Sequence, residues 1–389
     1  LVHQEDTMAE QIPFNRPWIT GKEIDYLADA VSSVRIGSDG PYTQKCAQLL
    51  QERLGIQRIL MTPSCTAALE MAVMLCDLGP GDEVIVPSYT FVSTALAVAR
   101  SGARPIFADI DPRTLNMDPA DVASLIGPAT RAILPVHYAG VGCDMTTISK
   151  LAQEHGLKVI EDAAQAVNST YQQQALGGIG HLGTFSFHES KNFGCGEGGA
   201  LAINDVEWID RAEIIRDKGT NRRQFFDGKV DKYTWVDWGS SFLPSELTCA
   251  FLYAQLQQMD EITRRRKAIC EYYQQRLAPL EKSGHLRLPV IPADCQSNYH
   301  LFHVITRDAA TRAALMKHLN DQEIHAVFHY VPLHTSRMGQ QLSPQTRSLP
   351  VTESLSAQLL RLPLFYEITD AQQDRVVSEI EKFFSASTA

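Results

Sequence analysis

The sequence predicts an α/β protein in which a mostly parallel sheet forms a large domain and a smaller α+β domain follows. Short apolar runs alternate with helical patterns over residues 64–203, which is typical of β-α units that build a buried parallel sheet. A long helical pattern over residues 245–277 then leads out of this region, which indicates a domain boundary near residue 250. The length of 389 residues also exceeds what one hydrophobic core usually holds. We therefore expect domains at residues 8–250 and 251–389, with residues 1–7 left out as a loose start.

The expected strands of the large domain are short runs of apolar and β-branched residues. In chain order they span residues 58–61, 83–86, 104–108, 132–136, 157–161 and 200–203. The second domain is expected to contain a long helix over 245–277, strands over 300–305 and 325–330, and helices over 309–319 and 371–384. The basic run 264–267 within the long helix is interpreted as a solvated helix face rather than a phosphate site.

Composition and charge argue against several classes of function. Hydrophobic residues make up 44% and charged residues 21% of the chain, which is ordinary for a globular protein. A net charge of −10 disfavours a general attraction to nucleic acid or to an anionic membrane. The sequence shows no apolar run long enough to span a bilayer and no signal peptide, so we expect a cytoplasmic protein. The eight cysteines are scattered without metal-ligand spacing, so no metal site is expected.

A candidate anion site lies where a helix is expected to begin after the first strand. The stretch TPSCTAALE, residues 62–70, places small and hydroxyl-bearing residues at that helix start. Free N–H groups and hydroxyls at a helix N-terminus bind anions. The simpler interpretation is that Ser64 or Thr66 only caps the helix, and this stretch alone favours it.

A carboxylate, Asp162, directly follows the expected strand 157–161. Ligands of open α/β sheets bind beyond the carboxyl ends of the strands, so Asp162 is positioned to meet one. A carboxylate in that place can keep a pyridine nitrogen protonated. A helix-capping role is an equally good interpretation of these residues alone.

Lys191 stands in an apolar and glycine-rich stretch between two expected strands, where a solvated charge is poorly placed. Burial disfavours the ammonium form of a lysine, and a Schiff base needs the neutral amine. The glycines over 194–199 let the backbone approach closely, although they also suit a plain hairpin turn. The Schiff-base role of Lys191 is favoured further because a candidate anion site and a strand-end carboxylate both precede it in the chain.

Several stretches together resemble the DegT/DnrJ/StrS family of sugar aminotransferases, which share the fold-type-I architecture of aspartate aminotransferase. The stretches are TPSCTAALEMA, PVHYAG, EDAAQ, SFHESKN, DKGTNR, KVDKYTW and VFHYVPLH, and the resemblance covers residues 12–384. Within the family, the chain most resembles members that aminate dTDP-4-oxo-6-deoxyglucose. The resemblance implies a pyridoxal 5′-phosphate (PLP) enzyme that forms a homodimer with shared active sites.

Carried over by position, the resemblance implies that Lys191 holds PLP as a Schiff base and later moves a proton between sugar and cofactor. It implies that Asp162 pairs with the pyridine nitrogen and that Gln165 hydrogen-bonds the phenolic oxygen of the ring. Phe91 matches the aromatic residue that stacks on the ring, although a core phenylalanine at a strand end is a second interpretation. The family's phosphate cradle corresponds to Cys65, Thr66 and Ser186.

Members of the family commonly reach the partner subunit's cofactor phosphate through an Asn-x-Arg segment. The corresponding residues 239–244 read GSSFLP, so both residues are missing and Ser241 is the candidate replacement as a hydroxyl donor. The basic segment 218–223, KGTNRR, offers Asn221, Arg222 and Arg223 for the substrate diphosphate, because arginine forks suit phosphate oxygens. A solvated loop is the second interpretation of this segment.

Three histidines are further candidates for contacts with the sugar or the diphosphate. His188 lies three residues before Lys191, and the stretch FHYVPLH contains His329 and His334. Each of them is also compatible with a purely structural role.

These implications predict that L-glutamate donates an amino group to the 4-keto carbon of a nucleotide-linked 4-keto-6-deoxyhexose in a ping-pong scheme, in the biosynthesis of surface polysaccharide. A 3-keto-sugar aminotransferase and a PLP-dependent sugar dehydratase stay open, although the dehydratases carry histidine where Lys191 stands. A PLP-binding regulatory protein is the third alternative, which the acidic charge and the lack of a helix-turn-helix pattern disfavour. The sequence alone does not decide between axial and equatorial amination, or between dTDP and UDP.

Overall fold

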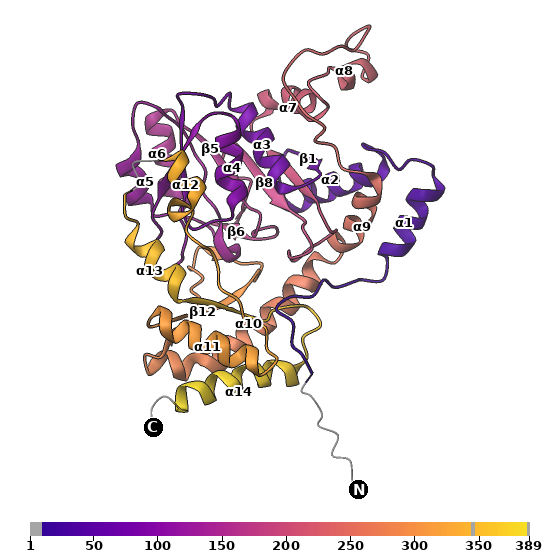
Figure 1. Ribbon diagram of the computed structural model, residues 1–389. Helices are drawn as coiled ribbons and strands as arrows, with labels where there is room; N and C mark the ends of the chain where they lie inside the picture. Colours follow the sequence, from indigo (N-terminus) through magenta and orange to yellow (C-terminus); the bar gives the residue numbers. More distant parts are fainter. Residues whose placement is uncertain (1–9, 344–346, 387–389) are drawn as a thin grey trace.

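The computed structural model describes residues 10–343 and 347–386, and Figure 1 shows their course. A seven-stranded sheet with helices on both faces forms the larger part of the molecule, and a three-stranded sheet lies in the C-terminal part. Segment 1–7 and Met8, where the predicted large domain begins, lie outside the described residues. Within the described ranges, no helix combines the length and hydropathy needed to cross a bilayer.

The large sheet has the strand order β1-β9-β8-β5-β4-β2-β3. Its strands span Arg58–Thr62 (β1), Glu83–Pro87 (β2), Arg104–Ala108 (β3), Thr130–Ile133 (β4), Lys158–Asp162 (β5), Leu182–Ser186 (β8) and Gly199–Ile203 (β9). All neighbouring pairs are parallel except those made by β9, which runs antiparallel to both β1 and β8. The predicted α/β class with a mostly parallel sheet is therefore confirmed.

Both faces of this sheet are buried, because successive side chains of a strand point to opposite faces and helices cover each one. In β1, Ile59 and Met61 pack into one hydrophobic cluster, whereas Leu60 packs into the other. The first face is covered by α2 (Pro41–Leu54), α6 (Met145–His155) and α9 (Glu246–Leu256). The second face is covered by α3 (Cys65–Leu75), α4 (Val92–Arg100) and α7 (Ile209–Arg216).

The C-terminal part is built around its own sheet and its own hydrophobic cluster. The antiparallel strands are β10 (Leu286–Arg287), β12 (Phe302–Thr306) and β13 (Leu359–Leu362). Three helices pack with them, α10 (Met259–Lys282), α11 (Ala309–Asp321) and α14 (Asp370–Ala386). Ile12 belongs to this cluster and forms a parallel bridge with Ile324, so the start of the described chain packs onto the C-terminal part.

The remaining elements are short and lie mostly at the periphery. The helices are α1 (Glu23–Ser32), α5 (Pro119–Leu125), α8 (Arg222–Phe226), α12 (Arg337–Leu342) and α13 (Pro350–Gln358). A second three-stranded sheet is formed by β11 (Cys295–Gln296), β6 (Thr170–Tyr171) and β7 (Gln174–Ala175). The 3-10 turns are η1 (Tyr138–Gly140), η2 (Val206–Trp208) and η3 (Leu333–Thr335).

Two predicted strands differ from the structure, and a proline contributes to each difference. The strand expected over 132–136 ends at Ile133 because Pro135 has no N–H to continue the ladder. The strand expected over 325–330 does not form, and only Val327 bridges Arg361 of β13. Pro363 would have to donate the next hydrogen bond along that pairing and cannot.

The helical pattern over 245–277 forms two helices, α9 and α10, rather than one. The break falls at Gln257 and Gln258, and Gln258 leaves the helical region with φ −107° and ψ 16°. Glutamine is a good helix former, so helix propensity does not predict a break at these two residues. Along α10, Ile262 still packs in the core of the large sheet, whereas Ile269 packs in the core of the C-terminal sheet. The domain division at residue 250 stays a prediction.

The basic run 264–267 is not a uniformly solvated face, which corrects the prediction. Arg264 pairs with Glu261 at the surface. Arg266, in contrast, is only 6% exposed and donates hydrogen bonds to the backbone carbonyls of Tyr299 and His300. One side of α10 packs against the protein, and the third residue of the run falls on that side.

Candidate active site

The strand topology collects polar residues at one edge of the large sheet. β1, β5 and β8 point in the same direction, so their last residues, Thr62, Asp162 and Ser186, lie at the same edge. A cavity of about 770 Å³ opens there, and residues 327–331 and 361–362 of the C-terminal part line its other side. This is the edge of an open α/β sheet at which ligands bind.

Lys191 lies in the connection between β8 and β9 and lines this cavity. Two fully buried rings, Phe187 and Phe193, anchor the connection on either side of the lysine. Hydrogen bonds of 2.8 Å from Phe187 N–H to the Gly198 carbonyl and from Lys191 N–H to the His188 carbonyl hold it in shape. The position of the lysine therefore follows from the aromatic residues around it.

The surroundings of Lys191 favour its neutral form. Burial lowers the pKa of Lys191, while the charges of Cys65 and Asp162 raise it and the charge of Arg361 lowers it again. The net pKa is below that of a solvated lysine. A larger fraction of the amine is therefore neutral near pH 7, and the neutral amine is the nucleophile.

Asp162 is the buried last residue of β5, and its carboxylate is held at both oxygens. Oδ2 accepts a hydrogen bond from the Thr94 hydroxyl at 2.8 Å, and Oδ1 accepts one from Ala164 N–H at 3.1 Å. Burial raises the pKa of Asp162 above that of a solvated aspartate, and the two hydrogen bonds and the charge of Lys191 offset this effect only in part. Residues 163–169 form turns and no helix, so the helix-capping interpretation is wrong.

The start of α3 borders the cavity with Ser64, Cys65 and Thr66. Ser64 does cap the helix, since its hydroxyl accepts from Ala67 N–H at 3.1 Å. The Thr66 hydroxyl lies 2.8 Å from that of Ser93. The first N–H groups of a helix have no partner within the helix, so capping and anion binding coexist at this helix start.

Gly199 is the first residue of β9, and its lack of a side chain lets the strand pass directly over the start of α3. A Cβ atom at this position would lie 2.4 Å from the backbone nitrogen of Cys65 and 2.3 Å from the Ser64 carbonyl carbon. Any side chain would therefore push the helix N-terminus away from the strand. The close approach gives the glycines of this connection a role beyond that of a hairpin turn.

Phe91, Gln165 and Ser186 also line the cavity. The Phe91 ring is 57% exposed and lies 6.4 Å from the Tyr330 ring, so it is not a core phenylalanine. Gln165 is buried; its Oε1 accepts from Ala139 N–H at 2.8 Å and its Nε2 donates to the Tyr330 hydroxyl at 3.1 Å. These partners fix the orientation of the Gln165 amide at the cavity wall.

The three candidate histidines fall into two groups. His188 and His329 line the cavity, whereas His334 does not. His334 is buried, with Nδ1 2.6 Å from the Ser88 hydroxyl and Nε2 3.1 Å from a Glu353 carboxylate oxygen. Both of its ring nitrogens have protein partners, so the structural interpretation of His334 is the better one.

The candidates Asn221, Arg222, Arg223 and Ser241 do not line the cavity of their own chain. Asn221 directly precedes α8, Arg222 and Arg223 belong to it, and Ser241 lies in the segment that follows. Figure 1 shows α8 projecting from the molecule on the side opposite to α14. Arg222 lies 3.5 Å from Asp217, and Arg223 lies 3.2 Å from Asp227. Asn221 is buried and accepts from Thr234 N–H at 2.7 Å, and Ser241 is exposed.

Several residues that line the cavity are not among the candidates predicted from the sequence. Arg266, His300, Tyr330 and Arg361 come from the C-terminal part, far from Lys191 along the chain. Burial, followed by the charges of Lys191 and Arg266, holds the pKa of His300 well below its usual value. Only the packing of the two parts brings these side chains together.

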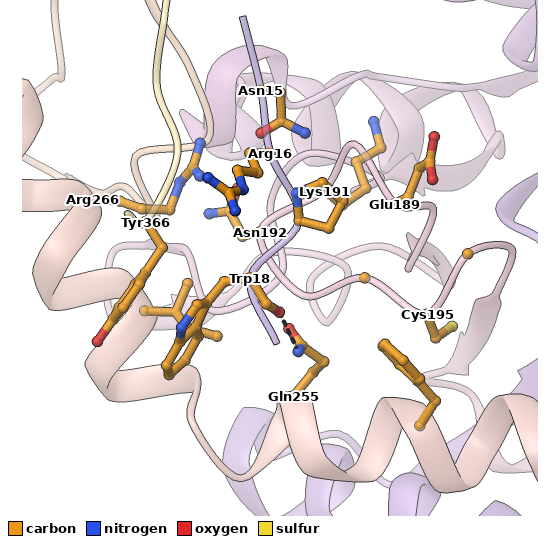
Figure 2. Close-up of a pocket in the computed structure, with 15 residues that line it drawn as sticks. Asn15, Arg16, Trp18, Glu189, Lys191, Asn192, Cys195, Gln255, Arg266 and Tyr366 are labelled. Atoms are coloured by element: carbon orange, nitrogen blue, oxygen red, sulfur yellow. Dashed lines mark hydrogen bonds between the residues drawn. The ribbon is translucent and has the colours of Figure 1, made fainter. Parts of the chain in front are cut away.

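A smaller hollow of about 300 Å³ adjoins the cavity and shares Asn15, Lys191 and Arg266 with it. In Figure 2 the Lys191 side chain points away from Trp18 and Gln255 at the other end of this hollow. The Gln255 amide donates to the Trp18 carbonyl at 2.8 Å. The amine of Lys191 is therefore directed away from that end of the hollow.

Residues 17–381 match the DegT/DnrJ/EryC1/StrS aminotransferase family. The chain belongs to this family. The match spans nearly the whole chain, so it includes the large sheet, the C-terminal sheet, Lys191 and Asp162.

Solved structures of other aminotransferases resemble this member of the family over nearly their full length. TlmJ from Streptoalloteichus hindustanus is 32% identical with a TM-score of 0.89, covering 97% of this chain and 100% of that chain. DesV from S. venezuelae, solved in complex with a ketimine intermediate, is 32% identical with a TM-score of 0.87, covering 96% and 98%. Spr1654 from Streptococcus pneumoniae, solved in its PLP-form, is 25% identical with a TM-score of 0.88, covering 96% and 98%. The protein is a PLP-dependent sugar aminotransferase of fold type I.

The residues of the cavity fit PLP. When bound, PLP supplies an electron sink that stabilises charge on the carbon bearing the amine. The helix start at Cys65 would suit the phosphate of PLP, and Lys191 would suit its carbonyl group. Asp162 would lie at the pyridine nitrogen, and the exposed ring of Phe91 would stack on the flat face of the ring. In the part of the chain that the structure describes, no group of three or more His, Cys, Asp or Glu residues is arranged to hold a metal ion.

Proposed function

We propose that this aminotransferase moves the amino group of L-glutamate to the 4-keto carbon of a nucleotide-linked 4-keto-6-deoxyhexose such as dTDP-4-keto-6-deoxyglucose. The observation that carries the proposal is the meeting of Lys191, Asp162 and the start of α3 in one cavity of about 770 Å³. The sequence stretches shared with transaminases of dTDP-4-oxo-6-deoxyglucose support the substrate class. A cytoplasmic location and a role in surface-polysaccharide synthesis are part of the same proposal.

In this proposal, Lys191 Nζ takes a proton from the donor carbon in the first half-reaction, and in the second half-reaction it delivers a proton to C4 of the sugar. Its lowered pKa leaves the free amine able to accept a proton. Asp162 keeps the pyridine nitrogen protonated through its negative charge. The Thr94 hydroxyl and Ala164 N–H both donate to the carboxylate, and donors stabilise its ionised form.

The other cavity residues orient the cofactor and the substrate. Gln165 donates to the phenolic oxygen of the ring, and Phe91 stacks on the ring face. The phosphate is held by Cys65, Thr66 and Ser186. His188 and His329 contact the sugar or its diphosphate, and His329 does so as a neutral ring, because burial and then the charges of Arg361 and Lys191 lower its pKa.

The product of one incubation tests this function. The purified protein is mixed with PLP, L-glutamate and dTDP-4-keto-6-deoxyglucose, and the product's regiochemistry and configuration are determined by NMR. We expect a 4-amino-4,6-dideoxyhexose together with 2-oxoglutarate. Amination only of a 3-keto sugar would replace the proposal by the 3-keto-sugar alternative, and PLP binding without any amine transfer would favour a regulatory protein.

We also propose that two copies of the chain share their active sites, with the segment around α8 reaching the cavity of the partner. This segment carries several large exposed apolar side chains, which in a folded protein mark an interaction surface. They include Phe226 (67% exposed), Trp235 (73%) and Trp238 (75%). Arg222 and Arg223 lie beside them and would meet the substrate diphosphate, while Ser241 would meet the cofactor phosphate.

Mixed dimers test the shared site. An Arg222→Ala subunit combined with a Lys191→Ala subunit places both defects in one site and leaves the other site whole. Activity per mixed dimer is therefore expected to return to about half of the wild-type value, since a two-fold dimer has two equivalent sites. Arg222→Ala alone should weaken binding of the nucleotide sugar and leave the glutamate half-reaction nearly intact. A strictly monomeric active enzyme, or mixed dimers without recovery, would refute the arrangement.

A further inference from the structure

A second cavity lies where the two parts of the molecule meet, and we call it the junction pocket. It has a volume of about 290 Å³. Its lining residues fall within 113–114 and 139–141 of the large-sheet part, and within 270–274, 289–291 and 297–303 on the C-terminal side. Lys191 and Asp162 do not line it, so it is distinct from the main cavity that contains these two residues.

Much of the lining of the junction pocket is apolar. Ala139, Val141 and Leu301 are buried beneath it. Val290 and Ile291 also line it and are 37% and 41% exposed. A ligand that fills the pocket removes these two side chains from water, which favours binding. Small-molecule sites combine such an apolar lining with a few polar groups that orient the ligand.

Three polar side chains of the junction pocket have no hydrogen-bond partner within residues 10–343 and 347–386. They are the guanidinium of Arg113, the amide of Gln274 and the hydroxyl of Tyr299. Arg113 and Gln274 are exposed and Tyr299 is half-buried, so a ligand can reach all three. Each of them can donate a hydrogen bond, so the pocket suits a ligand with strong acceptor atoms.

The charges around Arg113 favour an anion. In the described part of the chain, no carboxylate forms an ion pair with Arg113. Arg287 adds a second positive charge, since it donates at 3.4 Å to the backbone carbonyl just before Arg113. Glu271 also lines the pocket, but its carboxylate lies 3.6 Å from the amine of Lys267. Asp111 is engaged with the backbone, where it accepts the N–H of Arg113 at 3.0 Å.

The junction pocket and the main cavity share part of a wall. Leu301 lines both of them. Ala139 lines the junction pocket, and its N–H donates at 2.8 Å to Oε1 of Gln165, which lines the main cavity. In the same way, the carbonyl of Tyr299 accepts from Nε of Arg266 at 2.9 Å. A ligand that displaces residues of the shared wall therefore also moves side chains of the main cavity.

We propose that the junction pocket binds a small monocarboxylate with an aromatic or branched apolar body, and that its occupation weakens the binding of PLP in the main cavity. Arg113 pairs with the carboxylate, because a guanidinium fork matches its two oxygens. Gln274 and Tyr299 donate to the same group, and the apolar body packs on Val141 and Leu301. The inference goes beyond the proposed function, because it involves neither the amino donor nor the sugar.

The size and the lining of the junction pocket select this class of ligand. A volume of about 290 Å³ lies at the lower end for small-molecule sites and is too small for a nucleotide sugar. An inorganic anion would leave the apolar lining uncovered. A neutral apolar molecule would leave the guanidinium of Arg113 without an acceptor.

The effect on PLP follows from the shared wall. Closely packed residues do not deform freely, so a ligand body that presses on Leu301 and Ala139 displaces them. The displacement of Ala139 disturbs the hydrogen bond that orients the Gln165 amide in the main cavity. Linkage requires that PLP in turn weakens binding in the junction pocket by the same factor.

Calorimetric titration of the PLP-loaded enzyme with indole-3-acetate tests the binding site. We expect a Kd on the order of 1 mM, as is usual for a ligand of this size. Arg113→Gln should weaken binding by about tenfold, and Arg113→Lys should recover part of the loss. Gln274→Trp, at an exposed position of α10, should fill the pocket and abolish binding. Indole-3-ethanol has the same body without the charge and should bind the wild type about tenfold more weakly.

Arg337→Gln is the matched control. Arg337 is an exposed arginine of α12 that has no ion pair among the described residues and lines neither cavity. Its replacement should leave the affinity for indole-3-acetate unchanged. A wild type that does not bind the probe, or binding that survives both Arg113→Gln and Gln274→Trp, would exclude the site. Thermal unfolding of each variant shows whether it is folded.

Titration of PLP into the apoenzyme at increasing concentrations of indole-3-acetate tests the effect on the main cavity. We expect the apparent Kd for PLP to rise by about fivefold and then to reach a plateau, because ligands at two distinct sites change each other's affinity by a fixed factor. Gln274→Trp should show no rise. A Kd that rises without limit would place the probe in the main cavity, and an unchanged Kd would remove the coupling; either result overturns the proposal. Neither titration depends on amino transfer, so both are independent of the proposed function.

Discussion

Replacing Lys191 by alanine is expected to abolish amino transfer, with kcat reduced by at least about a thousandfold. The change removes the amine that the cavity places beside Asp162 and the start of α3. Among residues 10–343 and 347–386, no other lysine lines this cavity, so no neighbouring amine there can substitute as the base or the covalent anchor. Binding of pyridoxamine phosphate should persist, because the helix start and Asp162 do not depend on the lysine. Steady-state turnover and cofactor binding are measured on the same preparation.

Lys317→Ala is the control for this prediction, since Lys317 is an exposed residue of α11 that pairs with Asp321. It should leave turnover unchanged. Borohydride reduction of the yellow wild-type enzyme, followed by peptide mapping, should place the cofactor on the peptide that contains Lys191. Labelling of a different lysine, or more than a trace of activity in Lys191→Ala, would contradict the assignment.

Asp162→Asn is expected to slow the glutamate half-reaction by at least about a hundredfold, the usual cost of removing one preorganised electrostatic contact from a reacting group. The substitution keeps the shape of the side chain but removes the charge that would keep the pyridine nitrogen protonated. Cofactor affinity should fall much less, because in the proposed site the start of α3, and not Asp162, holds the phosphate. Single-turnover absorbance measurements with L-glutamate give the rate directly.

Asp144→Asn distinguishes this role from that of a structural aspartate. Asp144 caps α6 by accepting from Thr147 N–H at 3.0 Å, which is the function that the sequence alone also allows for Asp162. Its replacement should cost at most about 1 kcal/mol of stability and no activity. If Asp162→Asn behaves like Asp144→Asn, with a normal half-reaction rate, Asp162 has no part in the chemistry.

The sequence predicts those features that depend on residues close together along the chain. The strand over 104–108 is found exactly where it is predicted, because a buried parallel strand is a short apolar run bounded by turn residues. The place of Asp162 follows from its position at the end of β5, because the carboxyl ends of parallel strands lie at one edge of the sheet. Lys191 was located by the apolar and aromatic residues next to it, which are the same residues that bury its connection.

Contacts between distant segments were decided only by the tertiary structure. The basic run containing Arg266 has the composition of a solvated helix face, and only the direction in which α10 packs shows that this arginine is buried. Arg361 and Lys191 are 170 positions apart in the numbering, and no local pattern relates them. His334 faces Ser88 and Glu353 instead of the cavity because η3 turns it into the core.

The sequence by itself therefore determined the fold class and the places of Lys191 and Asp162 at the edge of the sheet, because each depends on residues that are neighbours along the chain. The tertiary structure alone decided which charged side chains face the cavity without a partner. Burial and ion pairing depend on which surfaces meet when the C-terminal sheet packs beside the large one, and a one-residue change in a helix face reverses them. Arg361 is the clearest case: an ordinary residue in the sequence, it becomes an unpaired buried donor only after folding.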